Sequence, residues 1–552
     1  MNRLPNVLFI MTDQQRFDAM SCAGNPEIRT PNMDRLAADG VLFRQACTTT
    51  PICVAARQSL ITGHRLSRTH WVDNRSLPGP NPELPTIMTM LHDLGYWNHC
   101  VGKTHFFNRH YGLHRHESAE EVRHSYVEDD YLTYLRRNHV PTRQPNGFRD
   151  LLYFQPQVNT IPVEHHKTTW VTDRSIEFLR THSRYNPNRP FFLWASYTAP
   201  HPPFAPPVPY DSMYDPESLG LPENPERALA DIPSPAWGHR RRMDGAHRDP
   251  ERLRRIRALY YGLTTQVDDG VGRLLDELER LGLYDDTVIV FFSDHGDMLG
   301  DHGLSQKNVP YEHSVRIPFI MRWPGRTEAG RRSDDLVGLT DVLPTLIHGL
   351  GGRYPTDNGP LDGSSLLAPG GGLLEPRREV FIDYGVGSNR WISLRSAEYK
   401  YAYWLTGGVE ELFDLSNDPW ETHNLAAEQP DGAAELRSQV MAWELENGFH
   451  ASVENGDLIA LPAPDPPGSD IAGLTVNDSR WPDHLPEEDR RELETFAEAF
   501  TKAIAKETTL SPEKLSIADY KRKGGDLRGT PWEAAWEAAE NAEDSDAFSK
   551  ET

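Results

Sequence analysis

Three uninterrupted apolar runs constrain the fold of this chain more than any other feature of its sequence. They occupy residues 6–13, 190–197 and 287–294, and the first and last of them end in Asp13 and Asp294. Continuous apolar runs of this length are typical of strands in a parallel sheet that is covered on both faces. Because ligand sites of such sheets lie at the carboxyl ends of the strands, we expect both acids to lie at a site.

Stretches with helical spacing of apolar residues lie between these runs. We expect helices over residues 31–39, 84–94 and 253–281. Gly40 would end the first helix in a left-handed conformation, and Gly270 would interrupt the third. Strands that alternate with helices predict the α/β class, with a mainly parallel sheet sandwiched by helices.

The pattern changes after about residue 375. Short alternating segments at 379–383, 390–395 and 399–404 predict an antiparallel sheet, and a helical pattern follows at 433–446. We therefore divide the chain into a large α/β domain (1–375), a smaller α+β domain of antiparallel sheet plus helix (376–451) and an acidic helical extension (452–552).

Length, charge and cysteine content exclude several classes of protein. A chain of 552 residues is too long for one ordinary core. Its 57 basic and 81 acidic residues give a net charge of −24, which argues against nucleic acid as a partner. The strictly apolar part of the first run, residues 7–11, is too short for a signal sequence or a membrane span, so we expect a cytoplasmic protein without membrane contact. Four cysteines without a CxxC pair agree with a reducing compartment.

Polar residues follow the first and third apolar runs in a pattern that suits a metal ion. Asp13 ends the first run and Gln14 comes directly after it. Asp294 ends the third run and His295 comes directly after it. If these strands are neighbours in a parallel sheet, three oxygen ligands and one imidazole meet at one edge. Such a set favours Ca2+, Mn2+ or Mg2+ over a metal that prefers thiolates.

A further group of residues, around Cys53, suits a nucleophile. Cys53 lies near the start of a short predicted helix that Gly63 would end, and Arg57 follows one turn later on the same face. The amino end of a helix favours an anion, and the guanidinium adds a fixed positive charge. These surroundings suit a nucleophile that attacks an anionic ester.

Five motifs occur in order between residues 5 and 447. They are Cys53-Val54-Ala55-Ala56-Arg57, Val101-Gly102-Lys103-Thr104-His105-Phe106, residues 293–300 (SDHGDMLG), a helical stretch at 336–350 and residues 412–425 (LFDLSNDPWETHNL). Together they resemble the sulfatase family of the alkaline phosphatase superfamily. The resemblance implies an alkaline-phosphatase-like fold and the hydrolysis of small-molecule sulfuric esters.

The resemblance also implies a set of roles for individual residues. In this family the motif cysteine is oxidised to formylglycine, whose hydrated aldehyde is the nucleophile. One divalent cation, Ca2+ or Mn2+, would be held by Asp13, Gln14, Asp294, His295 and the modified Cys53. Arg57 would hold the nucleophile, and Lys103 and Lys307 would bind the sulfuryl oxygens. His201 would protonate the leaving group, and His105 would take a proton from the second hydroxyl. Asn74 would contact the sulfuryl group.

Three departures from the common motif leave alternatives open. Ala55 stands where the family has proline, so the maturation enzyme that would generate formylglycine is not identified by the motif. Gln14 and His295 resemble the branch with choline sulfatases and phosphonate monoester hydrolases. A phosphonate monoester or phosphodiester hydrolase is therefore the first alternative, although Lys103 and His105 favour sulfate. A silent protein that binds sulfated ligands, with Cys53 left as a thiol, is the second. A thiolate nucleophile is disfavoured, because thiolate catalysis uses a nearby base and no hard metal.

The acidic extension carries large apolar side chains that a solvated tail would not need. Leu493, Phe496, Phe500 and Ile504 form one helical stripe, and Trp532 and Trp536 lie one turn apart. Full burial of the four stripe residues is worth roughly 6–12 kcal/mol. The stripe would pack on its own chain or across a two-fold axis, and we expect a homo-oligomer, a dimer or a tetramer.

Overall fold

The computed structural model describes a large α/β body, a smaller sheet and the first residues of the predicted extension, up to residue 465. The described residues are 3–79, 81–106, 109–121, 129–140, 146, 156–243, 245–368, 372–374 and 377–465. The predicted stripe and tryptophans of the extension lie outside them. Within the described residues no helix is both long and apolar enough to span a bilayer.

The larger sheet is mixed and mainly parallel. Its strands are β1 (Asn6–Asp13), β2 (Val41–Cys47), β3 (Trp97–Gly102), β4 (Arg115–Ser118), β5 (Phe191–Pro200), β6 (Thr287–Ser293), β7 (Phe319–Arg322) and β8 (Arg331–Gly338). Their order is β4-β3-β5-β1-β6-β7-β2-β8, and only β7 runs antiparallel to its neighbours. The strands predicted at 6–13 and 287–294 are therefore adjacent at the centre of the sheet.

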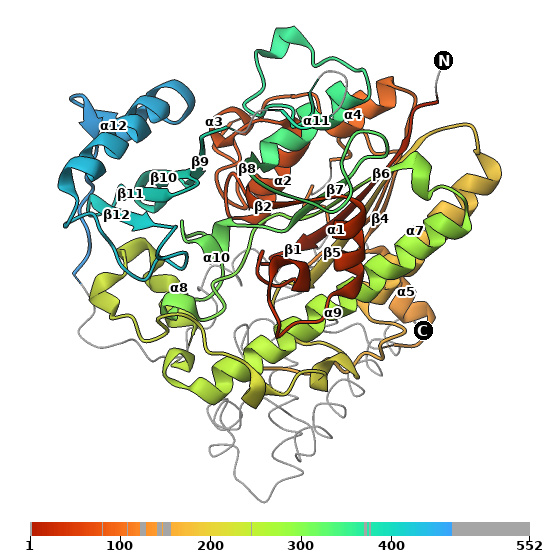
Figure 1. Cartoon of the computed structure of the whole chain (residues 1–552), viewed down its shortest axis with the longest axis horizontal. Coiled ribbons are helices and arrows are strands. Elements are labelled where there is room, and N and C mark those ends of the chain that lie inside the picture. Colours follow the sequence, from red (N-terminus) through yellow and green to blue (C-terminus); the bar gives the residue numbers. More distant parts are fainter. Residues whose placement is uncertain are drawn as a thin grey trace, which may run out of the picture.

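Alternate residues of β1 enter two separate hydrophobic layers, which explains why this strand is apolar throughout. Leu8 and Ile10 pack on one face, and Val7, Phe9 and Met11 on the other. The first face is covered by α1 (Pro31–Asp39), α5 (Asp130–Arg137), α7 (Lys167–Tyr185) and α9 (Pro250–Arg280), and the second by α2 (Cys53–Thr62), α4 (Ile87–Asp93) and α11 (Val342–Gly349). Figure 1 shows the two helical layers with the sheet between them. The predicted sandwich is confirmed.

Two glycines act differently from the prediction. Gly40 does end α1, but in an extended conformation (φ −136°). A Cβ there would lie 2.6 Å from the carbonyl oxygen of Met321 in β7, so this position requires glycine. Gly270 does not interrupt α9, which is continuous. A Cβ at Gly270 would lie 2.6 Å from Thr172 Oγ1 in α7, so the glycine allows close packing of two helices. Gly40 thus combines the end of α1 with a close approach to β7, whereas Gly270 serves close approach alone.

The motif at 336–350 is also more complex than the predicted helix. Residues 336–338 end strand β8, a short 3-10 turn follows at Leu339–Asp341, and α11 begins at Val342. Asp341 stabilises this change of direction, because its carboxylate accepts a hydrogen bond from Gly338 N (2.7 Å).

A second sheet follows, as the alternating segments predict. Strands β9 (Glu379–Tyr384), β10 (Trp391–Ser396), β11 (Tyr399–Trp404) and β12 (Val409–Asp414) are antiparallel in the order β12-β11-β10-β9. One face packs on α12 (Pro430–Asn447), and the short strands β13 (Val453–Glu454) and β14 (Asp457–Leu458) lie against the same layer. This unit lies at the left of Figure 1.

The other face of the second sheet packs on the start of α2. Val54 and Ala55 belong to one hydrophobic cluster with Ile382, Trp391 and Trp404. Every residue of α2 is buried. The small sheet thus covers the segment that carries the predicted nucleophile.

Candidate functional site

The strand register brings the two predicted carboxylates together. Thr12 of β1 lies opposite Ser293 of β6, so that Asp13 and Asp294 follow side by side at the carboxyl edge of the sheet. The backbone N–H of Gln14 donates to Asp294 Oδ1 (3.1 Å) and ties one strand end to the other. The sequence prediction that these strand ends converge is confirmed.

Helix α2 carries Cys53 to the same edge. The helix starts at Cys53 and ends at Gly63, whose φ of 70° is left-handed, as predicted. Its N-cap residue, Ile52, offers no side-chain cap, but Asn74 Oδ1 accepts a hydrogen bond from Val54 N (3.1 Å). The exposed side chain of Asn74 thus caps the start of α2 from a neighbouring loop.

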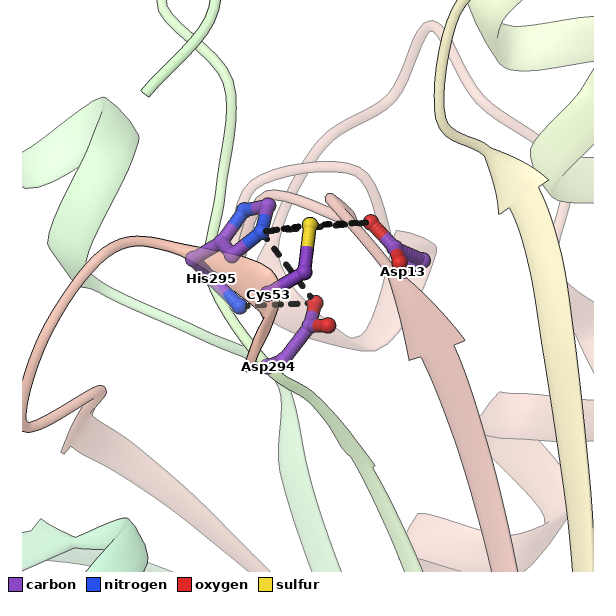
Figure 2. A group of neighbouring side chains, drawn as sticks. All are labelled: Asp13, Cys53, Asp294 and His295. Atoms are coloured by element: carbon purple, nitrogen blue, oxygen red, sulfur yellow. Dashed lines mark hydrogen bonds and ion pairs between the residues drawn. The ribbon is translucent and has the colours of Figure 1, made fainter. Parts of the chain in front are cut away.

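Asp13, Cys53, Asp294 and His295 form a buried group, which we call the donor group. Their ligand atoms all lie within 4.8 Å of one another. Cys53 Sγ lies 3.2 Å from His295 Nε2 and 3.7 Å from Asp13 Oδ1 (Figure 2).

The donor group fits a hard divalent cation. His295 Nδ1–H donates to the carbonyl of Gly296 (3.0 Å), so the Nε2 lone pair faces the two carboxylates. An outer hydrogen bond of this kind commonly fixes the tautomer of a metal-binding histidine. Two carboxylates and one imidazole, all fully buried, are ligands suited to Ca2+ or Mn2+.

Gln14 lies beside the donor group in an uncommon backbone conformation, with φ at 70°. Its Oε1 accepts a hydrogen bond from Lys307 Nζ (2.5 Å), and its Nε2 donates to Asp297. Asp297 also accepts hydrogen bonds from the backbone N–H groups of Leu299 (2.7 Å) and Gln306 (3.1 Å). Asp297, in the loop after β6, thus orients the amide of Gln14, and this amide in turn accepts the hydrogen bond from Lys307.

Arg57 is buried between the two carboxylates of the strand ends. Its guanidinium lies 2.9 Å from Asp294 Oδ2 and 3.2 Å from Asp13 Oδ2, and it also donates to the carbonyl of Lys103 (2.7 Å) and to Ser196 Oγ (3.1 Å). Burial alone would raise the pKa of Asp13 and of Asp294, but Arg57, Lys103 and nearby histidines hold both values below the ordinary range. Both carboxylates are therefore ionised at neutral pH.

The remaining predicted residues lie together near Cys53, and we call them the Lys–His group: Lys103, His105, His201 and Lys307. All four are buried. Lys307 Nζ lies 3.0 Å from His201 Nε2, and Lys103 Nζ pairs with Asp13. His201 Nδ1–H donates to the carbonyl of Pro202 (2.6 Å), which leaves Nε2 as the atom that faces the group. The structure thus brings together the residues predicted from separate motifs.

Burial controls the protonation of the site. It raises the pKa of the Cys53 thiol to about 12, and Asp13 adds to the rise, so an unmodified Cys53 is protonated at neutral pH. Burial and Lys103 lower the pKa of His105 well below its usual value. Burial and Lys307 do the same for His201, although Glu121 opposes the shift. Both imidazoles are neutral at neutral pH when no anion is bound.

Two carboxylates of the site are missing from the sequence prediction. Asp297 lies within the motif at 293–300, but its role depends on a loop that returns to Gln306. Glu121 contacts Lys103, His105 and His201. It follows β4, whose residues Arg-His-Glu-Ser are polar, so neither an apolar run nor a motif marks its position.

Comparisons with known proteins agree with this geometry. The family model described as "Sulfatase" matches residues 5–352, and that described as "N-sulphoglucosamine sulphohydrolase, C-terminal" matches residues 300–446. An arylsulfatase from Clostridium perfringens is 31% identical over 506 residues, covering 82% of this chain and 97% of that protein. The multifunctional alkaline phosphatase superfamily protein PehA from Trinickia caryophylli is 31% identical over 506 residues, with 80% and 95% covered.

Solved structures show the same fold. The phosphonate monoester hydrolase SpPMH from Silicibacter pomeroyi superposes with a TM-score of 0.68 at 25% identity, covering 83% of this chain and 99% of that one. Family model, relatives and fold agree over the part of the chain that contains the donor group and the Lys–His group. This chain is therefore a member of the sulfatase family, within the alkaline phosphatase superfamily.

Proposed function

We propose that the chain is a sulfuric ester hydrolase of the arylsulfatase type, with a formylglycine nucleophile derived from Cys53 and one divalent cation. The observation that carries the proposal is the position of Cys53 between two groups. Its Sγ lies within 4.8 Å of the ligand atoms of Asp13, Asp294 and His295, and equally within 4.8 Å of those of His105 and Glu121. A nucleophile at residue 53 would thus be close to both the cation site and the Lys–His group.

The cation would be bound by the donor group, with the modified Cys53 in place of the thiol and Gln14 beside it. When bound, it would supply Lewis acidity that neutralises negative charge and makes the nucleophilic hydroxyl more acidic. The buried carboxylates and the Nε2 lone pair of His295 support this assignment. The same donors suit Ca2+ and Mn2+.

The Lys–His group would bind the anionic part of the ester. Lys103 and Lys307 are buried ammonium groups, and such groups stabilise negative charge that develops on sulfuryl oxygens in the transition state. An anionic ester beside His201 would favour the protonated imidazole, and its Nε2–H would be the acid for the leaving oxygen. His105 Nδ1 has no hydrogen-bond partner among the described residues, and its Nε2 faces Glu121 (3.5 Å). A neutral His105 can accept a proton from the nucleophile.

The raised pKa of Cys53 supports a modified nucleophile rather than a thiolate. In the site without a cation, burial and Asp13 raise the pKa of this thiol to about 12, so it is almost fully protonated at pH 7. A thiolate nucleophile needs the opposite shift. Oxidation of Cys53 by a maturation enzyme would remove this obstacle, since a hydrated aldehyde carries hydroxyl groups in place of the thiol.

Intact-mass analysis of the Cys53 peptide, with turnover of aryl sulfates in Mn2+ or Ca2+, tests the proposal. We expect a formylglycine peptide, which has lost one sulfur and two hydrogens of the cysteine form and gained one oxygen, and hydrolysis that the C53A variant lacks. C53A activity above about a tenth of the wild-type kcat, a loss below about 1.4 kcal/mol, would contradict the role of residue 53. An unmodified peptide without turnover would instead favour a silent protein that binds sulfated ligands.

A second candidate is a phosphonate monoester or phosphodiester hydrolase that uses the same site. It is favoured by the likeness to the phosphonate monoester hydrolase SpPMH and to PehA, which is named as multifunctional. The two reactions share in-line geometry and negative charge spread over oxygens, so we expect both activities. The comparison of kcat/KM for matched aryl sulfate and phenyl phosphonate esters ranks them. An equal or higher value for the phosphonate would replace our preference for sulfate.

A further inference from the structure

Glu121 lies where the Lys–His group would receive an anion. Its Oε2 pairs with Lys103 Nζ and lies 3.5 Å from His105 Nε2, and its Oε1 lies 3.2 Å from His201 Nε2. The side chain is only 4% exposed. One carboxylate of the chain thus contacts three of the four residues that would bind the ester.

The neighbouring residue holds Glu121 in this position. The backbone N–H of Glu120 donates to Asp129 Oδ2 (2.7 Å), and its carbonyl accepts from Lys167 Nζ (2.5 Å). The Glu120 carboxylate accepts from Thr104 N (2.8 Å), in the turn between Lys103 and His105. Backbone and side chain of Glu120 are thus both fixed to the rim of the site, and Glu121 follows directly.

The charges around Glu121 show what its carboxylate changes. Lys103 and Lys307 are the two ammonium side chains of the Lys–His group, and Glu121 pairs directly with Lys103. Lys103 already faces two carboxylates, Asp13 and Glu121. Glu121 therefore removes one unit of the positive charge that an incoming anion meets.

We propose that Glu121 is a specificity-determining residue that favours singly charged esters over doubly charged phosphate monoesters. The inference rests on the proposed function, because it assumes that the Lys–His group binds the anionic part of an ester. Sulfate monoesters, phosphonate monoesters and phosphodiesters each carry one negative charge. The repulsion by a fixed carboxylate grows with ligand charge, so a phosphate monoester, with about two negative charges above pH 6, experiences twice as much.

Binding measured without turnover isolates this effect. Calorimetric titrations would use phenyl sulfate and phenyl phosphate at pH 8 with C53A and with C53A/E121Q, at one fixed concentration of Mn2+. Removal of one charge a few ångströms away is worth about tenfold in affinity per unit of ligand charge. We expect E121Q to tighten both ligands, and phenyl phosphate about tenfold more than phenyl sulfate.

Two control variants separate charge from shape and from general damage. C53A/E121D keeps the charge and should keep the preference for phenyl sulfate. C53A/E117Q removes another buried carboxylate at the end of β4, which pairs with Arg174 (2.5 Å) and His99 (3.1 Å), and should leave both affinities unchanged.

The outcomes are distinct. An equal change for both ligands in E121Q, weaker binding of both, or loss of the preference in E121D would overturn the role of Glu121 as a charge filter. That role is equally excluded if E117Q reproduces the effect of E121Q. Failure of C53A to bind either ligand would instead remove the proposed function, and the inference with it.

Discussion

Replacement of Arg57 by methionine tests whether the strand ends form a cation site. The guanidinium pairs with Asp294 (2.9 Å) and Asp13 (3.2 Å), and all three side chains are fully buried. Removal of one partner of a buried ion pair costs about 3–5 kcal/mol, because the other charge is left without compensation. Lys103 still pairs with Asp13 in the variant, so we expect the lower end, about 3 kcal/mol.

Thermal unfolding in the presence of a chelator measures this cost. An unfolding entropy of about 2.1 cal/mol/K per residue gives about 1.2 kcal/mol/K for the 552-residue chain. A loss of about 3 kcal/mol then lowers Tm by about 3 °C. The Tm of R57M without metal should fall by at least this amount, since no other cation of the described residues replaces the guanidinium at Asp294 Oδ2.

Addition of Mn2+ or Ca2+ then reports on the cation site itself. Arg57 repels a cation held by the same carboxylates, so its removal strengthens cation binding, and stabilisation by a ligand grows with affinity. We expect the same metal concentration to raise the Tm of R57M more than that of the wild type.

Arg390→Met is the matched control. Arg390 is also buried and pairs with Asp383 (3.2 Å) and Glu444 (2.5 Å), but it lies just before β10 of the second sheet. R390M should lose comparable stability without an added response to metal. A metal response of R57M no larger than that of R390M would refute the reasoning.

Three further predictions concern the leaving group, the helix packing and the extension. His201→Ala should lower kcat/KM for phenyl sulfates in proportion to the basicity of the leaving oxygen, and a uniform loss across substituted esters would exclude an acid role for His201. Gly270→Ala should lower the free energy of unfolding by about 1–3 kcal/mol, because the new Cβ meets Thr172, whereas Gly238→Ala meets open space and should be nearly neutral in denaturant titrations. Removal of residues 466–552 should lower the oligomeric mass in light scattering; an unchanged mass with unchanged activity would show that the extension is dispensable.

The parts of the site that follow from periodicity could be predicted from the sequence. The apolar runs of β1 and β6 locate two strands buried on both faces, and their ends carry Asp13 and Asp294. The spacing of Cys53 and Gly63 gives both ends of α2. These features depend on residues close in the chain, and local pattern is sufficient for them.

The parts that depend on distant contacts could not be predicted. Glu121 follows a polar edge strand, β4, and nothing near it in the chain indicates Lys103 or His201 as partners. Gly40 and Gly270 carry the sequence signature of helix breakers, yet their role is close contact with Met321 and Thr172. A glycine alone does not distinguish a turn from a close approach, because the neighbour lies elsewhere in the sequence.

The burial of Cys53 has a consequence for the timing of its oxidation. The side chain is 1% exposed, and its cover includes His295 of the loop after β6 as well as the second sheet over Val54 and Ala55. A ribosome adds about 5–20 residues per second, so residue 295 is made roughly 12–50 s after residue 53. We therefore expect the proposed oxidation to take place during synthesis, before strand β6 and the later second sheet have both folded over Cys53. Slower translation between these two residues would raise the modified fraction.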